Sequence, residues 1–237
     1  MKIINGDWYN IESDIARFDK YQCILADCPW LYNVQRKIRK DGATPTKGIG
    51  ACNHYPGIPT DDLARFNVGE QLGTNRSMLW LWATEPMLLH ALRVMAAWGF
   101  EYVTIGFTWI KLNKAAWKDS ALWEMGLREA AGMLSQPDPE RIRQVLNSLT
   151  VAGPGYYTMS NPEHLLIGRR GRAFRHAEKL KARQVVYWPL LSHSEKPDIF
   201  QDLIEMMYPK VTPRLELFAR RSKDGWDSFG NELGGLR

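Results

Sequence analysis

One short segment follows the apolar run "CILA" and combines side chains that could do chemistry, namely Asp27, Cys28, Pro29 and Trp30. The Asp27 carboxylate can accept a hydrogen bond from an amino group, and the carbonyl of Cys28 or Pro29 can accept a second. Pro29 fixes its torsion φ, which helps to hold these acceptors in place. The Trp30 ring offers a stacking face, worth about 1–3 kcal/mol per base. The segment predicts a receptor for a planar base with an exocyclic amine, and a simple turn is the alternative.

Strands and helices alternate around this segment and must position it. Predicted strands are "YQCILA", "SMLWLWA", "EYVTIGFTWIK", "EHLLIGRRG", "QVVYWP" and "RLELFAR". A helix is predicted from Thr84 to Gly99, and "KPDIFQDLIEMMYP" predicts another. This alternation is typical of one α/β domain over 1–237, with a doubly wound, mostly parallel sheet and helices on both faces. In such sheets ligands bind beyond the carboxyl ends of the strands, where Asp27 is expected.

Residues 115–151 do not fit the alternation, because they read as a pair of helices around a Pro-Asp-Pro break. We interpret them as a helical insertion within the domain. A substrate-side element, a lid and a dimerisation element are the three alternatives. The sequence leaves open whether the protein is a monomer or a homodimer.

The composition excludes several classes of protein. The chain has 237 residues and 45% hydrophobic content, with no apolar run near the ~18 residues that a membrane span needs. The first residues lack the apolar core of a signal peptide, so we expect a cytoplasmic protein. Its three cysteines form no disulfide framework and show no zinc-ligand spacing, so no metal is expected.

The net charge is only +5, but positive charge is concentrated in two cationic runs, residues 36–40 and 169–183. Cationic runs that follow a candidate site favour phosphate contacts, and a solvated surface is the alternative. The predicted contacts are Arg36, Lys37, Arg39, Lys40, Arg169, Arg170 and Arg172.

Several long segments, in order, resemble the MT-A70 family of S-adenosylmethionine-dependent adenine N6-methyltransferases. "ILADCPW" resembles the family's Asp-Pro-Pro-Trp segment, with Cys28 in place of a proline. "YPGIPTDDL", "LWLWATEP", "GYYTMSNPEHLLIGRRG", "HSEKPDIFQDLIEMMYP" and "RLELFARRSKDGWDSFGNEL" resemble further family segments. The resemblance covers nearly the whole chain apart from the insertion. It implies a Rossmann-like methyltransferase domain with S-adenosylmethionine as cofactor.

The resemblance also implies roles for individual residues. Asp27, Pro29 and Trp30 would bind and wall the target amine. The implied cofactor-binding residues are Asp7, Trp8, Asp27, Lys196, Arg220, Asn231 and Glu232. The implied substrate-binding residues, besides the cationic runs, are Cys28, Tyr55 and Glu163. A nucleophilic Cys28 is an alternative, although methylation of an amine needs no covalent intermediate.

The expected substrate is adenine in DNA, in a bacterial or phage setting, with the base flipped out of the stack. The chain lacks the zinc-finger and RNA-binding appendages of eukaryotic messenger-RNA writers, which favours DNA over RNA. RNA adenine methylation, cytosine N4 methylation and a non-catalytic nucleic-acid-binding subunit are the alternatives.

Overall fold

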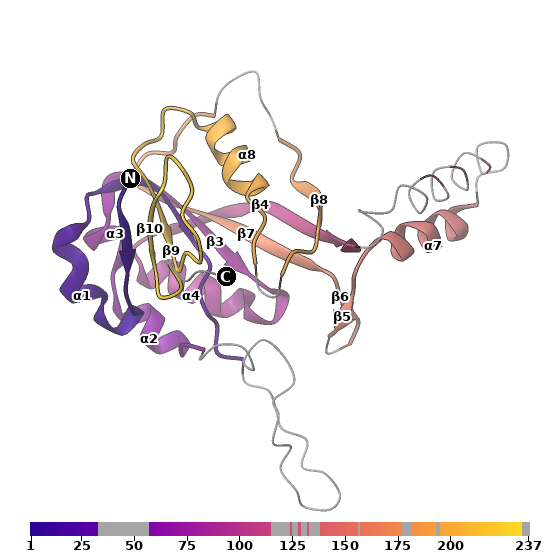
Figure 1. Cartoon of the computed structure of the whole chain (residues 1–237), viewed down its shortest axis with the longest axis horizontal. Coiled ribbons are helices and arrows are strands. Elements are labelled where there is room, and N and C mark those ends of the chain that lie inside the picture. The colour runs from indigo at the N-terminus through magenta and orange to yellow at the C-terminus, as the bar shows by residue number, and fades with distance from the viewer. Residues whose placement is uncertain are drawn as a thin grey trace, which may run out of the picture.

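The computed structural model describes residues 1–32, 57–114, 124, 128, 132, 138–155, 157–176, 182–192 and 195–233. An eight-stranded sheet forms its centre, in the order β1-β10-β9-β2-β3-β7-β4-β8 (Figure 1). The strands are β1 (Ile3–Asn5), β2 (Tyr21–Ala26), β3 (Gly73–Ala83), β4 (Glu101–Leu112), β7 (Pro162–Arg170), β8 (Val185–Pro189), β9 (Arg214–Leu217) and β10 (Asp227–Gly230). A separate hairpin consists of β5 (Gly153–Pro154) and β6 (Met159–Ser160).

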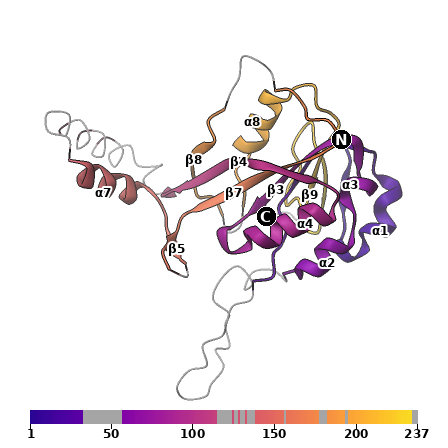
Figure 2. The ribbon, with the colours of Figure 1, turned by 180° about the vertical axis from the view of Figure 1, so that it is seen from behind.

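Helices cover both faces of this sheet (Figures 1 and 2). Helix α8 (Ile199–Met207) lies over one face, whereas α2 (Thr60–Arg65) and α4 (Leu88–Ala97) lie over the other. The remaining described helices are η1 (Trp8–Asn10), α1 (Ile11–Asp14), η2 (Ile15–Arg17), α3 (Val68–Gln71), η4 (Glu85–Met87) and α7 (Pro139–Leu149). Within the described ranges, no helix is long and apolar enough to cross a membrane.

The central strand β2 is buried on both faces, which explains its unbroken apolar run. Ile24 and Ala26 belong to the core under α2 and α4, whereas Cys23 and Leu25 belong to the core under α8. Side chains of successive strand residues point to opposite faces, so a strand covered twice needs apolar residues at every position. The first polar side chain after the strand, Asp27, therefore lies where the sheet ends.

Strand β7 is antiparallel to both of its neighbours, β3 and β4, whereas the other strand pairs are parallel. His164 lies opposite Ala83, at the carboxyl end of β3, and Arg170 lies opposite Ser77. The amino end of β7 therefore shares an edge with the carboxyl ends of β2, β3 and β4. The mostly parallel, Rossmann-like sheet predicted from the alternation of elements is confirmed.

The local signals at the helix after β3 also match the structure. Thr84 precedes the short turn η4, which continues directly into α4. Gly99 follows α4 with a φ of +78°, a left-handed conformation that glycine adopts without strain. Of the predicted insertion 115–151, the structure describes α7 and its flanks together with three isolated residues. The role of the insertion stays a prediction.

Candidate active site

Three cavities meet at Asp27, at the carboxyl edge of the sheet. The first, of about 370 Å³, runs between the start of α8 and the end of β9. The second, of about 150 Å³, lies between the segment after β1 and the end of β10. The third, of about 450 Å³, lies under aromatic side chains from β3 and β4. After the ligands expected from the sequence, we call them the linking cavity, the adenosine cavity and the base cavity. Asp27 forms part of the wall of each.

A chain of alternating charges crosses this junction. Asp27 Oδ2 lies 2.8 Å from the Lys196 ammonium, which lies 3.3 Å from Glu163 Oε2. The other Glu163 oxygen, Oε1, lies 2.7 Å from the ammonium of Lys111. Each of the four side chains is less than one quarter exposed. Two carboxylates and two ammonium groups thus neutralise one another in a partly desolvated place.

The two carboxylates of this chain have opposite pKa shifts. Burial raises the pKa of Asp27, and the Lys196 ammonium only partly opposes that effect. Burial would also raise the pKa of Glu163, but Lys196 and Lys111 together hold it below its ordinary value. Glu163 is therefore the more firmly ionised of the two. Asp27 is the carboxylate more readily available to a proton or to an amine donor.

Aromatic side chains wall the base cavity. Trp30, Trp82 and Trp109 line it, and the Trp30 indole N–H donates to the Trp82 carbonyl at 3.2 Å. This hydrogen bond fixes the plane of a ring that could stack on a flat ligand. The Pro29 carbonyl already accepts from the Ile58 amide at 2.7 Å, and the Cys28 carbonyl accepts from the Trp30 amide at 2.9 Å. Each of these carbonyls has one lone pair left for a further donor.

The thiol of Cys28 has no feature of a nucleophile. It is buried, and both burial and the adjacent Asp27 charge raise its pKa well above the ordinary value. A nucleophilic cysteine needs its thiolate form, which usually depends on a lowered pKa.

The adenosine cavity brings together the predicted cofactor residues from both ends of the chain. It is lined by Asp7, Trp8, Asp27, Cys28, Pro29, Arg220, Asn231 and Glu232, among others. The Arg220 guanidinium is 2.6 Å from the Glu232 carboxylate, so these two residues contact each other. The Asp7 carboxylate accepts from the Tyr9 amide at 2.9 Å and thereby begins the turn η1.

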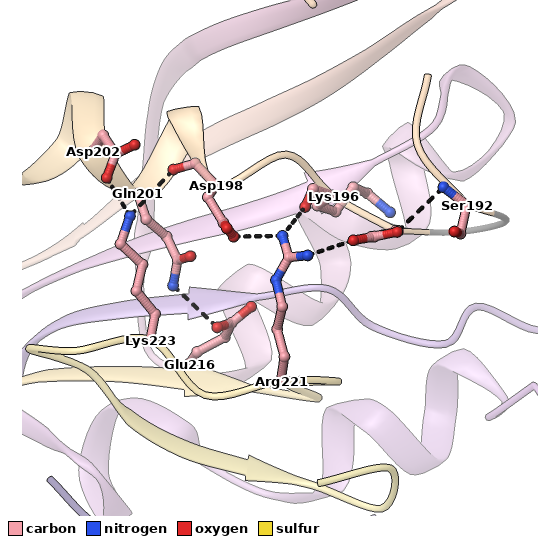
Figure 3. Close-up of polar contacts among 9 residues, drawn as sticks. Ser192, Lys196, Asp198, Gln201, Asp202, Glu216, Arg221 and Lys223 are labelled. Carbon is pink, nitrogen blue, oxygen red and sulfur yellow. Dashed lines mark hydrogen bonds and ion pairs between the residues drawn. The ribbon is translucent and has the colours of Figure 1, made fainter. Parts of the chain in front are cut away.

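Lys196 belongs to a loop that Arg221 holds from below (Figure 3). The Arg221 guanidinium donates to the Lys196 carbonyl at 3.0 Å and pairs with the carboxylates of Glu195 and Asp198. Lys223, two residues further along the chain, pairs instead with Asp202 in α8. The loop therefore places the Lys196 ammonium through contacts made by its neighbours.

Sequence reasoning missed four residues of the site. Lys111 and Arg221 act through contacts with predicted residues, as described above. Glu216 lines the linking cavity and accepts from Gln201 at 3.0 Å (Figure 3). Phe218 adopts a φ of 62°, which is unusual for a bulky residue, and its ring lies 4.8 Å from that of Trp8. The only signal was their position at the carboxyl ends of β4 and β9.

The second cationic run does not lie beside the site. Arg169 and Arg170 end β7, and Arg169 pairs with Glu101 at the start of β4. Because β7 is antiparallel, this end is about 20 Å from Glu163 along the strand, at ~3.3 Å per residue. Arg172 follows at the same far edge, where its carbonyl accepts from Arg76 at 3.1 Å. The phosphate contacts expected of Arg169, Arg170 and Arg172 stay a prediction, now at this distance from Glu163. Tyr55, Arg36, Lys37, Arg39 and Lys40 lie outside the described residues.

The sequence model of the MT-A70 family matches residues 21–123 and 141–232. The chain belongs to the MT-A70 family. MT-A70 proteins are S-adenosylmethionine-dependent methyltransferases, so the cofactor of this chain is S-adenosylmethionine. The unmatched stretch falls inside the helical insertion predicted for 115–151.

Individual MT-A70 relatives come from bacteria and plants. The chain is 27% identical over 224 residues to the type II methyltransferase M.MunI of Mycoplasma sp, covering 90% of this chain and 78% of that protein. It is 23% identical over 236 residues to a probable N(6)-adenosine-methyltransferase MT-A70-like of Oryza sativa subsp. japonica. It is 22% identical over 237 residues to the N(6)-adenosine-methyltransferase MT-A70-like of Arabidopsis thaliana. The matches cover 99% and 98% of this chain, but only 26% and 27% of these plant proteins.

The cavities of this MT-A70 chain fit such a cofactor. In the adenosine cavity, the rings of Trp8 and Phe229 suit a purine, and the exposed polar side chains of Asn231 and Glu232 suit hydroxyl groups. The linking cavity adds Lys196 and Glu216, which suit an amino-acid end group that carries both charges. No cluster of three metal-binding side chains occurs among the residues that the structure describes.

Proposed function

We propose that this protein transfers a methyl group from S-adenosylmethionine to the N6 amine of adenine in DNA. The single observation that carries the proposal is the meeting of three cavities at the Asp27 carboxylate. An amine held by Asp27 in the base cavity would face the linking cavity directly. The flipped base would lie between the aromatic walls of the segment Asp27–Trp30 and of β3 and β4.

The chain's own residues position and desolvate the amine. Asp27 accepts a hydrogen bond from it, with the Pro29 carbonyl as second acceptor, and Trp30 stacks on the ring. The charge chain keeps Asp27 in one orientation through Lys196 and excludes bulk water. The bound cofactor supplies an activated methyl group. Because the neutral amine attacks, no strong general base is required, and the proton released afterwards can pass to Asp27.

The similarity to a type II methyltransferase supports DNA as the substrate. The plant relatives, named N(6)-adenosine-methyltransferases, support RNA adenine methylation as the second candidate. A non-catalytic binding subunit agrees less well with a chain that has Asp27, Lys196 and Asn231 together. Location in the cytoplasm of a bacterial or phage-infected cell, and contact between DNA and the first cationic run, belong to the same proposal.

The test measures transfer of labelled methyl to duplex DNA, single-stranded DNA and RNA, with nucleoside mass spectrometry of each product. We expect N6-methyladenine in DNA, and we expect it to disappear with Asp27→Ala. N4-methylcytosine, or N6-methyladenine in RNA alone, would overturn the DNA adenine assignment. A protein that binds cofactor and methylates nothing would indicate a missing partner subunit, and a protein that binds no cofactor would favour the binding-subunit alternative.

A further inference from the structure

The β5–β6 hairpin projects from the molecule near one end of β7 (Figure 1). Its second strand ends at Ser160, whose hydroxyl donates to the Glu85 carboxylate at 2.9 Å. Glu85 directly follows Thr84, a wall residue of the base cavity. Beyond Ser160, the chain enters β7 and reaches Glu163, another wall residue. The base of the hairpin is therefore fixed at the rim of the base cavity.

The tip of the hairpin carries an unusual side chain for a position in water. Tyr157 is fully exposed, at 102%, and Met159 is 64% exposed. No charged residue occurs anywhere from Ala152 to Asn161. Every other exposed large hydrophobic side chain in the described part of the chain is less exposed than Tyr157. A ring this exposed adds little to the folded core and is accessible to a partner.

Gly155, two residues before Tyr157, lies very close to the backbone of Thr158. A Cβ atom added at Gly155 would lie 2.2 Å from the Thr158 carbonyl oxygen, so the backbone can approach this closely only with glycine. The strand pairs Gly153–Ser160 and Pro154–Met159 close the hairpin just below the tip. Tyr157 therefore lies two residues before the paired position Met159, close to the rim of the base cavity.

We propose that Tyr157 inserts into the base stack of duplex DNA and fills the place that the flipped adenine leaves. This inference rests on the proposed function and extends it to the step before methyl transfer. Removing a base from the stack costs a few kcal/mol, and a flat apolar side chain that enters the gap restores part of the lost stacking. An uncharged aromatic tip beside a base cavity suits this role better than a contact with phosphates, which needs cations.

The experiment compares Tyr157→Ala and Tyr157→Phe with the wild type on three substrates of one sequence. These are a matched duplex, the same duplex with an abasic site opposite the target adenine, and the single strand. Tyr102→Ala is the matched control, because Tyr102 is an exposed tyrosine at the opposite edge of the sheet. Thermal unfolding and cofactor binding of each variant are measured alongside.

We expect Tyr157→Ala to lower kcat/KM on the matched duplex by about 5- to 150-fold, the range of one lost stacking contact. The loss should be smaller on the abasic duplex and less than about threefold on the single strand, where little or no stacking has to be replaced. Tyr157→Phe and Tyr102→Ala should behave like the wild type. A 2-aminopurine placed at the target should become more fluorescent with the wild type than with Tyr157→Ala.

Three outcomes would overturn the inference. An equal loss on all three substrates would mean that the hairpin only shapes the cavity, and no loss on any would mean that Tyr157 does not contact DNA. A dimer in solution that Tyr157→Ala dissociates would assign the tip to a second copy of the chain. If the wild type methylates only RNA or another base, the proposed function itself fails, and that result is visible before any variant is compared.

Discussion

The Lys196 ammonium lies 2.8 Å from the Asp27 carboxylate, at the seam between the base cavity and the linking cavity. The same ammonium also lies 3.3 Å from Glu163. Lys196 therefore separates two carboxylates that would otherwise repel each other in a partly buried place. We therefore expect Lys196 to contribute to stability, in addition to the cofactor binding proposed for it.

Replacing Lys196 by methionine should destabilise the fold in a pH-dependent way. Without the ammonium, the pKa of Asp27 rises further in the folded state, and the folded protein binds protons more tightly than the unfolded chain. The stability of the variant then falls as pH rises. Relative to the wild type, we expect its free energy of unfolding to be lower by about 1–3 kcal/mol at pH 8 and by less at pH 5. Urea unfolding at both pH values measures this, with Lys196→Arg as control. An equal loss of stability at the two pH values would contradict an origin in the pKa of Asp27.

Lys111→Met should change the pH dependence of catalysis. Lys111 and Lys196 hold the pKa of Glu163 down, so removing one cation raises that pKa. We expect the acidic limb of the pH profile of kcat/KM to move to higher pH. At pH 7, kcat/KM should fall about 10- to 100-fold, the effect of one lost hydrogen bond to a charged group. Lys111→Arg should keep the profile of the wild type. A uniform loss at every pH would indicate misfolding instead.

Arg221→Gln should weaken cofactor binding more than stability. The guanidinium is 43% exposed, so its ion pairs contribute less than about 1 kcal/mol to the free energy of unfolding. It nevertheless holds the loop that carries Lys196 (Figure 3). We expect the KM for S-adenosylmethionine to rise about tenfold, or 1.4 kcal/mol. Lys223→Gln, which removes the neighbouring pair with Asp202, is the control and should leave KM unchanged.

Glu216→Gln should stabilise the protein above neutral pH. Burial, with the charge of Asp27, raises the pKa of Glu216 from 4.5 to about 7. A raised carboxyl pKa means that stability falls as pH rises from about 4.5 to 7. At 1.36 kcal/mol per pKa unit this penalty amounts to about 3 kcal/mol at pH 8, and none of it is present at pH 4. Thermal unfolding of both proteins at pH 4 and pH 8 measures the gain, and a gain at pH 4 would refute this origin.

Cys28→Ala separates the two roles considered for the thiol. Loss of a covalent nucleophile costs about 10⁶-fold in kcat, whereas loss of a buried wall atom should cost less than about tenfold here. The raised pKa predicts the second result. Steady-state kinetics of the variant decide between them, and intact mass after iodoacetamide treatment at pH 8 should show Cys28 unmodified in the folded protein.

The sequence predicted the parts of the site whose position follows from the ends of elements. Asp27 could be placed because β2 is apolar from Cys23 to Ala26 and a polar side chain follows where the strand ends. Lys111 could not be predicted as a site residue. A lysine at the end of a strand resembles any solvated lysine until the position of Glu163, its ion-pair partner, is known. That placement depends on β7 being antiparallel, and no local pattern in β7 reveals its direction.

The same reversal decides where the second cationic run lies. Arg169 follows Glu163 closely in the sequence, but the two residues are separated by most of β7. In an antiparallel strand the residues that follow the site lead away from it, so Arg169 and Arg170 lie at the opposite edge. Glu163 and these arginines are close in the sequence but lie at opposite ends of β7, so they are far apart in space.

The shared wall at Asp27 also matters for inhibition. Since this one side chain borders all three cavities, a compact molecule could occupy two of them by crossing beside it. Such a compound would link a purine-like head to an amino-acid-like arm. A mutation of Asp27 that weakened the compound would also damage the enzyme, so resistance would have to arise elsewhere. Cys28, on the same wall, would then be the position at which a compound could be made selective for this chain over relatives with proline there.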